Sequence, residues 1–278
     1  MDETVVVTGA STGIGEACAL HLDRLGFRVL AGIRKSEDGE TLRKRASDRF
    51  RPVLLDVTDG DSIARAAREV GPVAGLVNNA GIVVAGPLEF LPLDELRRQL
   101  EVNVIGQVAV TQAFLPALRA AKGRVVNIGS VSGLIATPFL GPYCASKFAL
   151  EALTDSLRME LRPWGIRVSI VEPGAIATPI WEKSRAQASR VAAALPESGK
   201  ELYAAALARM DEFTEALSKK AIPAAEVARA VEHALTARRP KRRYLLGRRT
   251  RFEAGMFRLI PPGWRDGIIL RALRLPDA

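Results

Sequence analysis

The chain has 278 residues, of which 48% are hydrophobic and only 5% aromatic, and it carries a net charge of +9 at pH 7. This length suits one large α/β domain or two small ones, and the core must be largely aliphatic. The acidic start MDETVVVTGA and the lack of any run of about 18 apolar residues argue against a signal peptide and a membrane-spanning helix. The two cysteines, Cys18 and Cys144, suit a reducing, cytoplasmic setting and form no metal-site pattern.

Strand-like and helix-like segments alternate along the chain. Short, almost continuously apolar runs predict strands at Thr4–Thr8, Phe27–Ile33, Pro52–Leu55, Val73–Val77, Arg124–Ile128, Ile166–Val171 and Lys241–Leu246. Helical patterns fill the intervals, at Gly13–Leu25, Asp38–Ser47, Asp59–Val70, Leu93–Ala121, Pro142–Arg162, Ile180–Ser218 and Pro223–Ala237. This alternation predicts a single doubly wound α/β (Rossmann) domain over residues 1–246. We expect about seven parallel strands, joined by right-handed crossovers and flanked by helices on both faces.

A glycine-rich turn, TGASTGIG at residues 8–15, joins the first strand to the first helix. Glycines are needed at such a turn because a Cβ would keep a diphosphate off the backbone. The helix N-terminus then offers free N–H groups to that anion. The spacing G-x3-G-x-G, with no Lys after Gly13, points away from a nucleoside triphosphate loop and leaves a dinucleotide site or a plain turn.

Two polar segments follow the third and fourth strands. Asp56 comes after the third strand, where an acid can hold the adenine amino group, and Asn78–Gly81 follows the fourth. Both segments lie at carboxyl ends of strands, where open α/β sheets bind their ligands. The alternatives are a helix cap or turn residue for Asp56 and a plain turn for Asn78–Gly81.

The end of the second strand bears on which nicotinamide cofactor is bound. A free ribose 2′-OH favours Asp or Glu there, whereas a 2′-phosphate favours Arg. The sequence supplies Arg34 and Lys35 and no acid at this point, which favours NADP, with NAD as the alternative. Because Glu37 and Asp38 follow closely, Arg34 could also be a solvated loop charge.

Tyr143 and Lys147 give the sharpest chemical signal. They lie four residues apart on a predicted helix and so share a face. A neighbouring ammonium favours the ionised phenol, so we expect the pKa of Tyr143 to lie below its usual value of about 10 and to suit general acid–base catalysis. Ser130, just after the fifth strand, could polarise a carbonyl, and Asn103 could hold a water that relays protons to Lys147.

Other catalytic interpretations are weaker. The segment GSVSG at residues 129–133 has Val131 at its centre, where a nucleophile elbow needs Ser. His21 and His233 lie on predicted helices remote from the carboxyl edge of the sheet. We therefore expect neither a Ser-His-Asp hydrolase nor a histidine metal site.

Together, TGASTGIG, Asp56, NNAG, Asn103, Ser130, YCASK and Pro173-Gly174 resemble the short-chain dehydrogenase/reductase family over roughly residues 4–180. The resemblance implies hydride transfer between NADP or NAD and an alcohol, ketone or aldehyde. It places the catalytic tetrad at Asn103, Ser130, Tyr143 and Lys147. The cofactor-binding residues that it implies are Gly9, Ser11, Thr12, Gly13, Ile14, Gly15, Arg34, Asp56, Val57, Asn79, Ala80, Gly81, Tyr143, Lys147, Pro173, Gly174, Ile176 and Thr178.

The resemblance also sets the alternatives. Thr12 stands where many NADP-dependent members carry a basic residue, and AGIRKS and LDVTD resemble the retinol, steroid and hydroxybutyrate dehydrogenase branch, whose members often use NAD. Similar proteins form homodimers or homotetramers through the two long helices predicted at 93–121 and 142–162. A catalytically inactive, cofactor-binding regulatory protein on the same fold is the second function class, and the intact tetrad argues against it.

Residues 180–222 are rich in Ala and Leu, with Phe and Met among them. They predict a helical substrate-binding lid and a lipophilic alcohol or ketone as substrate, although Ala-rich helices can also be plain scaffold.

The charge excess lies at the C-terminus, where residues 238–278 hold 12 Lys or Arg against 3 Asp or Glu. Within 247–278, arginines alternate with Phe252, Phe257, Trp264 and aliphatic residues, which predicts a basic amphipathic extension that touches an anionic membrane peripherally. Packing on the lid or on a partner subunit is the alternative. No nucleic acid is expected, because the charge is not spread over a folded surface.

Overall fold

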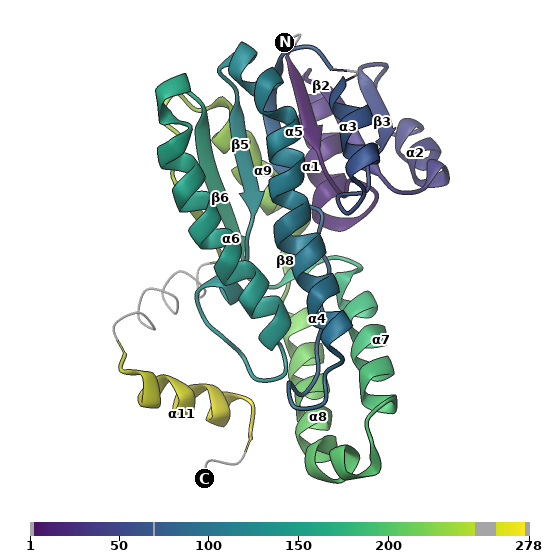
Figure 1. The fold of residues 1–278 in the computed structure, drawn as a ribbon, viewed down its shortest axis with the longest axis vertical. Helices are drawn as coiled ribbons and strands as arrows, with labels where there is room; N and C mark the ends of the chain where they lie inside the picture. The colour runs from purple at the N-terminus through teal and green to yellow at the C-terminus, as the bar shows by residue number, and fades with distance from the viewer. Residues whose placement is uncertain (1–2, 69, 248–259, 276–278) are drawn as a thin grey trace.

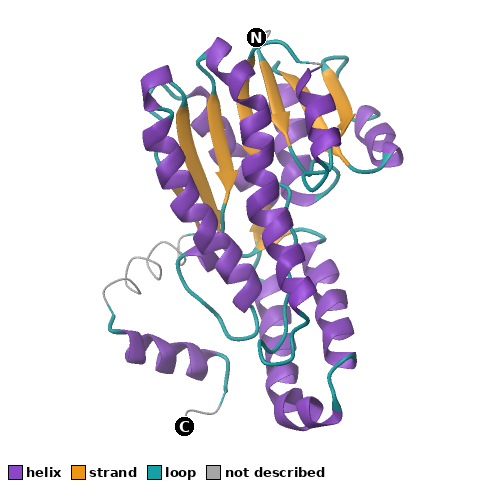
Figure 2. Cartoon of the chain, viewed as in Figure 1, coloured by secondary structure: helices purple, strands orange, loops and turns teal. Residues whose placement is uncertain are grey.

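A computed structural model describes residues 3–68, 70–247 and 260–275 (Figures 1 and 2). Its strands are β1 (Thr4–Val7), β2 (Arg28–Ile33), β3 (Phe50–Leu54), β4 (Val73–Asn78), β5 (Arg124–Ile128), β6 (Arg167–Pro173), β7 (Ile176–Ala177), β8 (Ile222–Pro223) and β9 (Arg243–Leu246). Its α-helices are α1 (Gly13–Arg24), α2 (Ser36–Arg43), α3 (Gly60–Arg68), α4 (Leu93–Leu100), α5 (Gly106–Ala121), α6 (Gly141–Glu160), α7 (Ile180–Ala193), α8 (Glu197–Ser218), α9 (Ala224–Thr236) and α11 (Pro262–Ala272).

Seven strands form one parallel sheet in the order β3-β2-β1-β4-β5-β6-β9. The prediction of a doubly wound sheet with about seven strands is confirmed. The order reverses between β1 and β4, and open α/β sheets bind ligands at such a point, outside the carboxyl ends of the strands. In Figure 1 the strands run towards the end of the molecule where α7 and α8 project.

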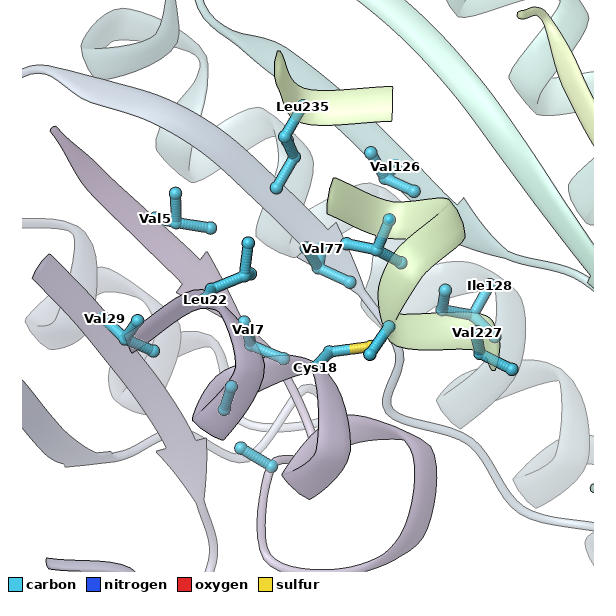
Figure 3. Packing of buried hydrophobic residues seen from close by; sticks show 14 of the residues in the cluster. Val5, Val7, Cys18, Leu22, Val29, Val77, Val126, Ile128, Val227 and Leu235 are labelled. Atoms are coloured by element: carbon cyan, nitrogen blue, oxygen red, sulfur yellow. The ribbon is translucent and has the colours of Figure 1, made fainter. Parts of the chain in front are cut away.

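Side chains alternate between the two faces of the sheet, because successive residues of a strand point in opposite directions. In β1, Val5 and Val7 belong to a core cluster with residues of α1 and α9, whereas Val6 belongs to the cluster on the opposite face with residues of α3 and α5. Figure 3 shows the first cluster, in which Cys18 packs among aliphatic side chains. Both faces are therefore covered, which explains why the strands are almost continuously apolar.

The helix predicted at Leu93–Ala121 contains a π-helical segment, Glu101–Ile105, between α4 and α5. Asn103 lies within it and is fully buried. Periodicity alone gives no sign of such a segment, and π-helical turns occur often at functional sites. By length and composition Leu93–Ala121 could cross a membrane. However, Val110, Phe114 and Leu118 are buried in the second core cluster, as in a core helix of a globular domain.

The helix predicted at Ile180–Ser218 is two helices, α7 and α8, separated at Ala194–Pro196. A proline at residue 196 removes a backbone donor, so one continuous helix is disfavoured there. The segment that carries α7 and α8 leaves the domain and returns to it at one place, because β7 pairs in parallel with β8 and Ile222 N donates to Ala175 O at 2.9 Å. Boundaries elsewhere shift by one to a few residues, as for α2, which begins at Ser36 and ends at Arg43.

Part of the charge excess at the C-terminus belongs to the domain itself. Arg243, on β9, forms ion pairs with Glu151 and Asp155 of α6 and with Glu172 of β6. Its side chain is thus a cross-link between the last strand and α6, not a free tail charge. Residues 248–259 of the predicted extension lie outside the described residues, and α11 follows them.

Candidate active site

The glycine turn is fixed by hydrogen bonds from the end of β4. The Asn79 side-chain amide donates to Thr8 O at 2.9 Å and to Gly9 O at 3.0 Å. The Thr8 hydroxyl accepts from the backbone N–H groups of Asn79 and Ala80 at 2.9 and 3.0 Å. The segment Asn79–Gly81 is therefore a clamp on the glycine turn, not a plain turn.

Two glycines of the turn cannot carry a side chain. Gly9 has φ +62°, and a Cβ there would lie 2.8 Å from Ala80 Cα. A Cβ on Gly15 would lie 2.2 Å from Gly9 O and 2.4 Å from the Asn79 amide nitrogen. The N-cap of α1, Thr12, makes no capping hydrogen bond with its side chain, so that side chain does not occupy the first-turn N–H groups. This cradle fits the diphosphate of a dinucleotide.

One cavity of about 510 Å³ runs from this turn past the ends of the other strands. Of the sequence-predicted site residues it is lined by Gly9, Ser11, Thr12, Gly13, Ile14, Arg34, Asp56, Val57, Asn79, Ala80, Gly81, Asn103, Ser130, Tyr143, Lys147, Pro173, Gly174, Ile176 and Thr178. Only Gly15 is absent from the lining. Gly15 lets α1 approach the turn, because a Cβ there would meet Gly9 O and the Asn79 amide.

Tyr143 and Lys147 lie on α6, one helical turn apart, with the Lys147 ammonium 5.8 Å from the centre of the Tyr143 ring. Lys147 is buried, and Nζ donates to Ile128 O at 2.8 Å. Burial lowers the pKa of Lys147 to about 8, and the nearby Glu151 carboxylate opposes that shift.

The pKa of Tyr143 is raised, which contradicts the expectation that Lys147 would lower it. Burial of the phenol is the main cause, because it disfavours the phenolate, and a side-chain hydrogen bond with Ser130 acts in the opposite direction. Periodicity places the ammonium beside the phenol, but it does not reveal how far both groups are removed from water.

Asn103 acts as a brace within the structure. Its side-chain oxygen accepts from Ile82 N at 2.9 Å, and its amide donates to Ile82 O at 3.0 Å and to the Ser146 hydroxyl at 3.2 Å. The side chain thus joins the loop after β4 to α6, beside Tyr143 and Lys147. These contacts use both N–H groups of the side-chain amide, so a water held by that side chain would have to donate to its oxygen.

Asp56 lines the cavity, and its side chain also stabilises the turn after β3, the alternative role that the sequence allowed. Its Oδ1 accepts from the backbone N–H and the hydroxyl of Thr58, at 2.9 and 2.8 Å.

The two histidines lie away from the cavity lining. His21 pairs with Glu232, and His233 contacts the Tyr244 hydroxyl, so both imidazoles have partners elsewhere. Within the described ranges, no group of three or more His, Cys, Asp or Glu is arranged to hold a metal ion.

The sequence predicted a lid over residues 180–222, but not which of its residues line the cavity. These come from α7 and α8 and include Trp181, Lys183, Arg185, Leu207, Met210, Phe213 and Leu217. Helical periodicity marks both helices, but no motif shows which of their faces turns towards the sheet.

The arrangement of glycine cradle, paired Tyr and Lys, and carboxyl-end cavity defines a nicotinamide-dependent oxidoreductase. The sequence pattern of the short chain dehydrogenase family matches residues 3–189, and the chain belongs to that family. It is 36% identical to the NADPH-dependent 3-dehydrocapnine reductase of Ornithobacterium rhinotracheale, over 97% of this chain and 96% of the relative. It is 42% identical to human retinol dehydrogenase 5, over 87% of this chain and 80% of the relative.

A solved short-chain dehydrogenase from Burkholderia cenocepacia, in complex with NADP, has a TM-score of 0.73 at 27% identity and covers 99% of this chain and 98% of its own. The predicted reaction class is thus confirmed. The protein interconverts an alcohol and a carbonyl compound with a nicotinamide cofactor, and the resemblance to the retinol dehydrogenase branch is also confirmed.

Replacing Tyr143 by Phe is expected to lower kcat by about 100- to 10,000-fold, because the change removes the transferable proton and little volume. Cofactor affinity should stay nearly unchanged. Steady-state kinetics and a cofactor titration of the same preparation check both points. A variant with near-normal kcat would contradict acid–base catalysis by Tyr143.

The pKa of Lys147 predicts an alkaline limit. As pH rises through about 8, the ammonium loses its proton and with it the positive charge beside Tyr143. In the direction of carbonyl reduction, kcat/KM for the reduced cofactor should therefore be flat below about pH 8 and fall tenfold per pH unit above it. This parameter is the one to follow because kcat/KM reports the ionisable groups of the free enzyme. Lys147→Arg, which keeps its charge, should lack this limb. A wild-type profile that stays flat to about pH 9.5 would show that Lys147 does not titrate there.

Proposed function

We propose that the chain is an NADP(H)-dependent dehydrogenase/reductase for lipophilic alcohols and ketones. The observation that carries the proposal is one continuous cavity that joins the glycine cradle, Ser130, Tyr143 and Lys147 to apolar side chains of α8. The intact tetrad favours this enzyme over an inactive, cofactor-binding regulatory protein.

Each residue of the tetrad has a part in the proposed reaction. When bound, the nicotinamide supplies or accepts the hydride. Tyr143 gives a proton to the carbonyl oxygen during reduction and takes it back during oxidation. The Ser130 hydroxyl orients that oxygen, Lys147 supplies positive charge beside the phenol, and Asn103 braces the wall that carries both.

Arg34 supports the choice of NADP. It lines the cavity just after β2, and Asp56, Val57 and Thr58, which follow the paired strand β3, line the same cavity. A guanidinium can grip a 2′-phosphate with two hydrogen bonds. The relative from Ornithobacterium rhinotracheale is described as NADPH-dependent, in agreement with this proposal.

We therefore expect NADPH to bind more tightly than NADH, and Arg34→Ala to narrow that gap by about 1.5–3 kcal/mol, the range for hydrogen bonds to charged groups. Binding titrations of both cofactors test this. Tighter binding of NADH by the unmodified protein would show that Arg34 is a solvated loop charge.

The lid, residues 180–222, supports a lipophilic substrate. The cavity that Tyr143 lines is also lined by Trp181 of α7 and by Leu207, Met210, Phe213 and Leu217 of α8. An apolar wall favours apolar ligands and excludes water during hydride transfer. Relatives named for retinol and 3-dehydrocapnine fit this proposal.

A panel of carbonyl compounds tests the substrate class. Cofactor absorbance should show higher kcat/KM for decalin-sized ketones and long-chain ketones than for small hydrophilic sugars, because only the former fill the apolar wall. The converse order would contradict the lipophilic proposal and leave the reaction class untouched.

We further propose a homodimer or homotetramer that pairs through α5 and α6. Ile105, which precedes α5, and Phe148 and Met159 on α6 expose 53%, 44% and 67% of their surfaces. Phe148 and Met159 are eleven residues apart, so they share one face of α6. Three large apolar groups on neighbouring helices suit a subunit contact.

The C-terminal extension is proposed to contact an anionic membrane surface, with the protein otherwise cytoplasmic. On α11, Trp264 and Ile268 are 75% and 41% exposed and lie one turn apart, with Arg271 close by on the same side. Packing on the protein is also visible, because Leu273 is buried and Arg209 of α8 donates to Arg274 O at 2.7 Å. The end of α11 is thus held on the lid helix while its exposed aromatic face is free to meet lipid.

Sedimentation with vesicles tests the membrane contact. Binding should need anionic lipid, weaken with salt and disappear when residues 247–278 are removed. The double variant Trp264→Ser/Ile268→Ser should bind more weakly with its charge unchanged. If the full-length protein ignores anionic vesicles at low salt, the extension is structural.

A further inference from the structure

The glycine turn has no cation of its own. Residues 9–15 contain no Lys, Arg or His. The nearest charged residue, Glu16 in the first turn of α1, is acidic and is paired with Arg45. A diphosphate would thus find backbone N–H groups there, and its two negative charges would lack a side-chain partner within the turn.

Four basic side chains line the cavity, and three of them are placed elsewhere. Lys147 donates to Ile128 O beside Tyr143. Arg185 pairs with Asp211 of α8 at 2.8 Å. Arg34 stands at the end of β2, where the adenosine ribose is expected. The fourth is Lys183.

Lys183 reaches the glycine turn from α7. Its Nζ donates to the Thr12 hydroxyl at 3.4 Å, a contact between residues 171 positions apart in the sequence. In the described part of the chain Lys183 forms no ion pair, so its charge is not neutralised by a carboxylate. The start of its helix is held in place, because Thr178 and Pro179, just before α7, pack against Gly13, with 3.1 Å between Thr178 Cβ and an ideal Cβ on Gly13.

We propose that Lys183 is a ligand of the cofactor diphosphate, supplied by the lid, and that it couples closure of α7 to cofactor binding. The inference rests on the proposed use of this cavity by NADP(H) or NAD(H). An ammonium beside Thr12 would meet both diphosphate charges after a small movement of a flexible side chain. Since α7 carries the ammonium and its base is pinned by β7 and β8, that contact would draw α7 over the bound cofactor.

The proposal separates Lys183 from Arg34. The diphosphate is common to NADPH and NADH, so Lys183→Ala should raise the dissociation constant of both by a similar factor, about tenfold or more. Arg34→Ala should affect NADPH alone. Adenosine 2′-monophosphate, which has no diphosphate, should bind Lys183→Ala as it binds the unmodified protein and should bind Arg34→Ala more weakly.

Calorimetric titration of the full chain measures these constants. Lys183→Arg keeps the charge and should stay within about threefold of the unmodified protein. Arg190→Ala removes one exposed charge from the same helix, outside the cavity lining, and serves as the matched control. Both dissociation constants unchanged in Lys183→Ala, or changed no more than in Arg190→Ala, would overturn the proposal. If the unmodified protein binds neither cofactor, it is the proposed function that fails.

Limited proteolysis with chymotrypsin tests the coupling at saturating cofactor, where affinity no longer matters. NADPH should protect the lid from cleavage in the unmodified protein and protect it less in Lys183→Ala. Equal protection of the two saturated proteins would overturn the coupling of closure to binding.

Discussion

The site depends on the hydrogen bonds between the ends of β1 and β4. Asn79 and Thr8 exchange donors and acceptors there, which holds the glycine turn open at the point where the strand order reverses. Gly9 and Gly15 leave no room for a Cβ at this junction. The cavity, the cradle at the N-terminus of α1 and the approach of α7 to Gly13 all take their positions from this one clamp.

Beyond the carboxyl ends of the strands, α7 and α8 form one unit that leaves and rejoins the domain at the same place. The short pair of β7 and β8 fixes its two ends at one place, Arg185 and Asp211 link α7 to α8, and Tyr203 of α8 packs edge-on against Phe90 and Phe139. The contacts of Tyr203 also tie α8 to the segments after β4 and β5, which carry Phe90 and Phe139. The apolar wall proposed for the substrate and the ammonium proposed for the cofactor thus lie on the same pair of helices.

The sequence predicted the sheet, the glycine turn and the Tyr143–Lys147 pair because each is encoded locally, whereas the full tetrad came from the resemblance to the family. Strand periodicity, the turn glycines and the spacing of Tyr143 to Lys147 are read within a few residues. It did not predict the π-helical segment at Asn103, the role of Arg243 or the contact of Lys183 with Thr12. These depend on tertiary partners far away in the chain, and no local pattern records them.

The raised pKa of Tyr143 was missed for the same reason, and it bears on the direction of the reaction. A buried phenol keeps its proton at neutral pH, and the protonated form is the one that reduction of a carbonyl consumes. Oxidation starts from the phenolate, which burial disfavours and the Ser130 hydrogen bond favours. Burial also lowers the pKa of Lys147 to about 8, so the ammonium that would stabilise a phenolate is itself lost at alkaline pH. Both shifts have one cause, the exclusion of water; at neutral pH the phenol keeps its proton, and Lys147, with a pKa of about 8, keeps its charge.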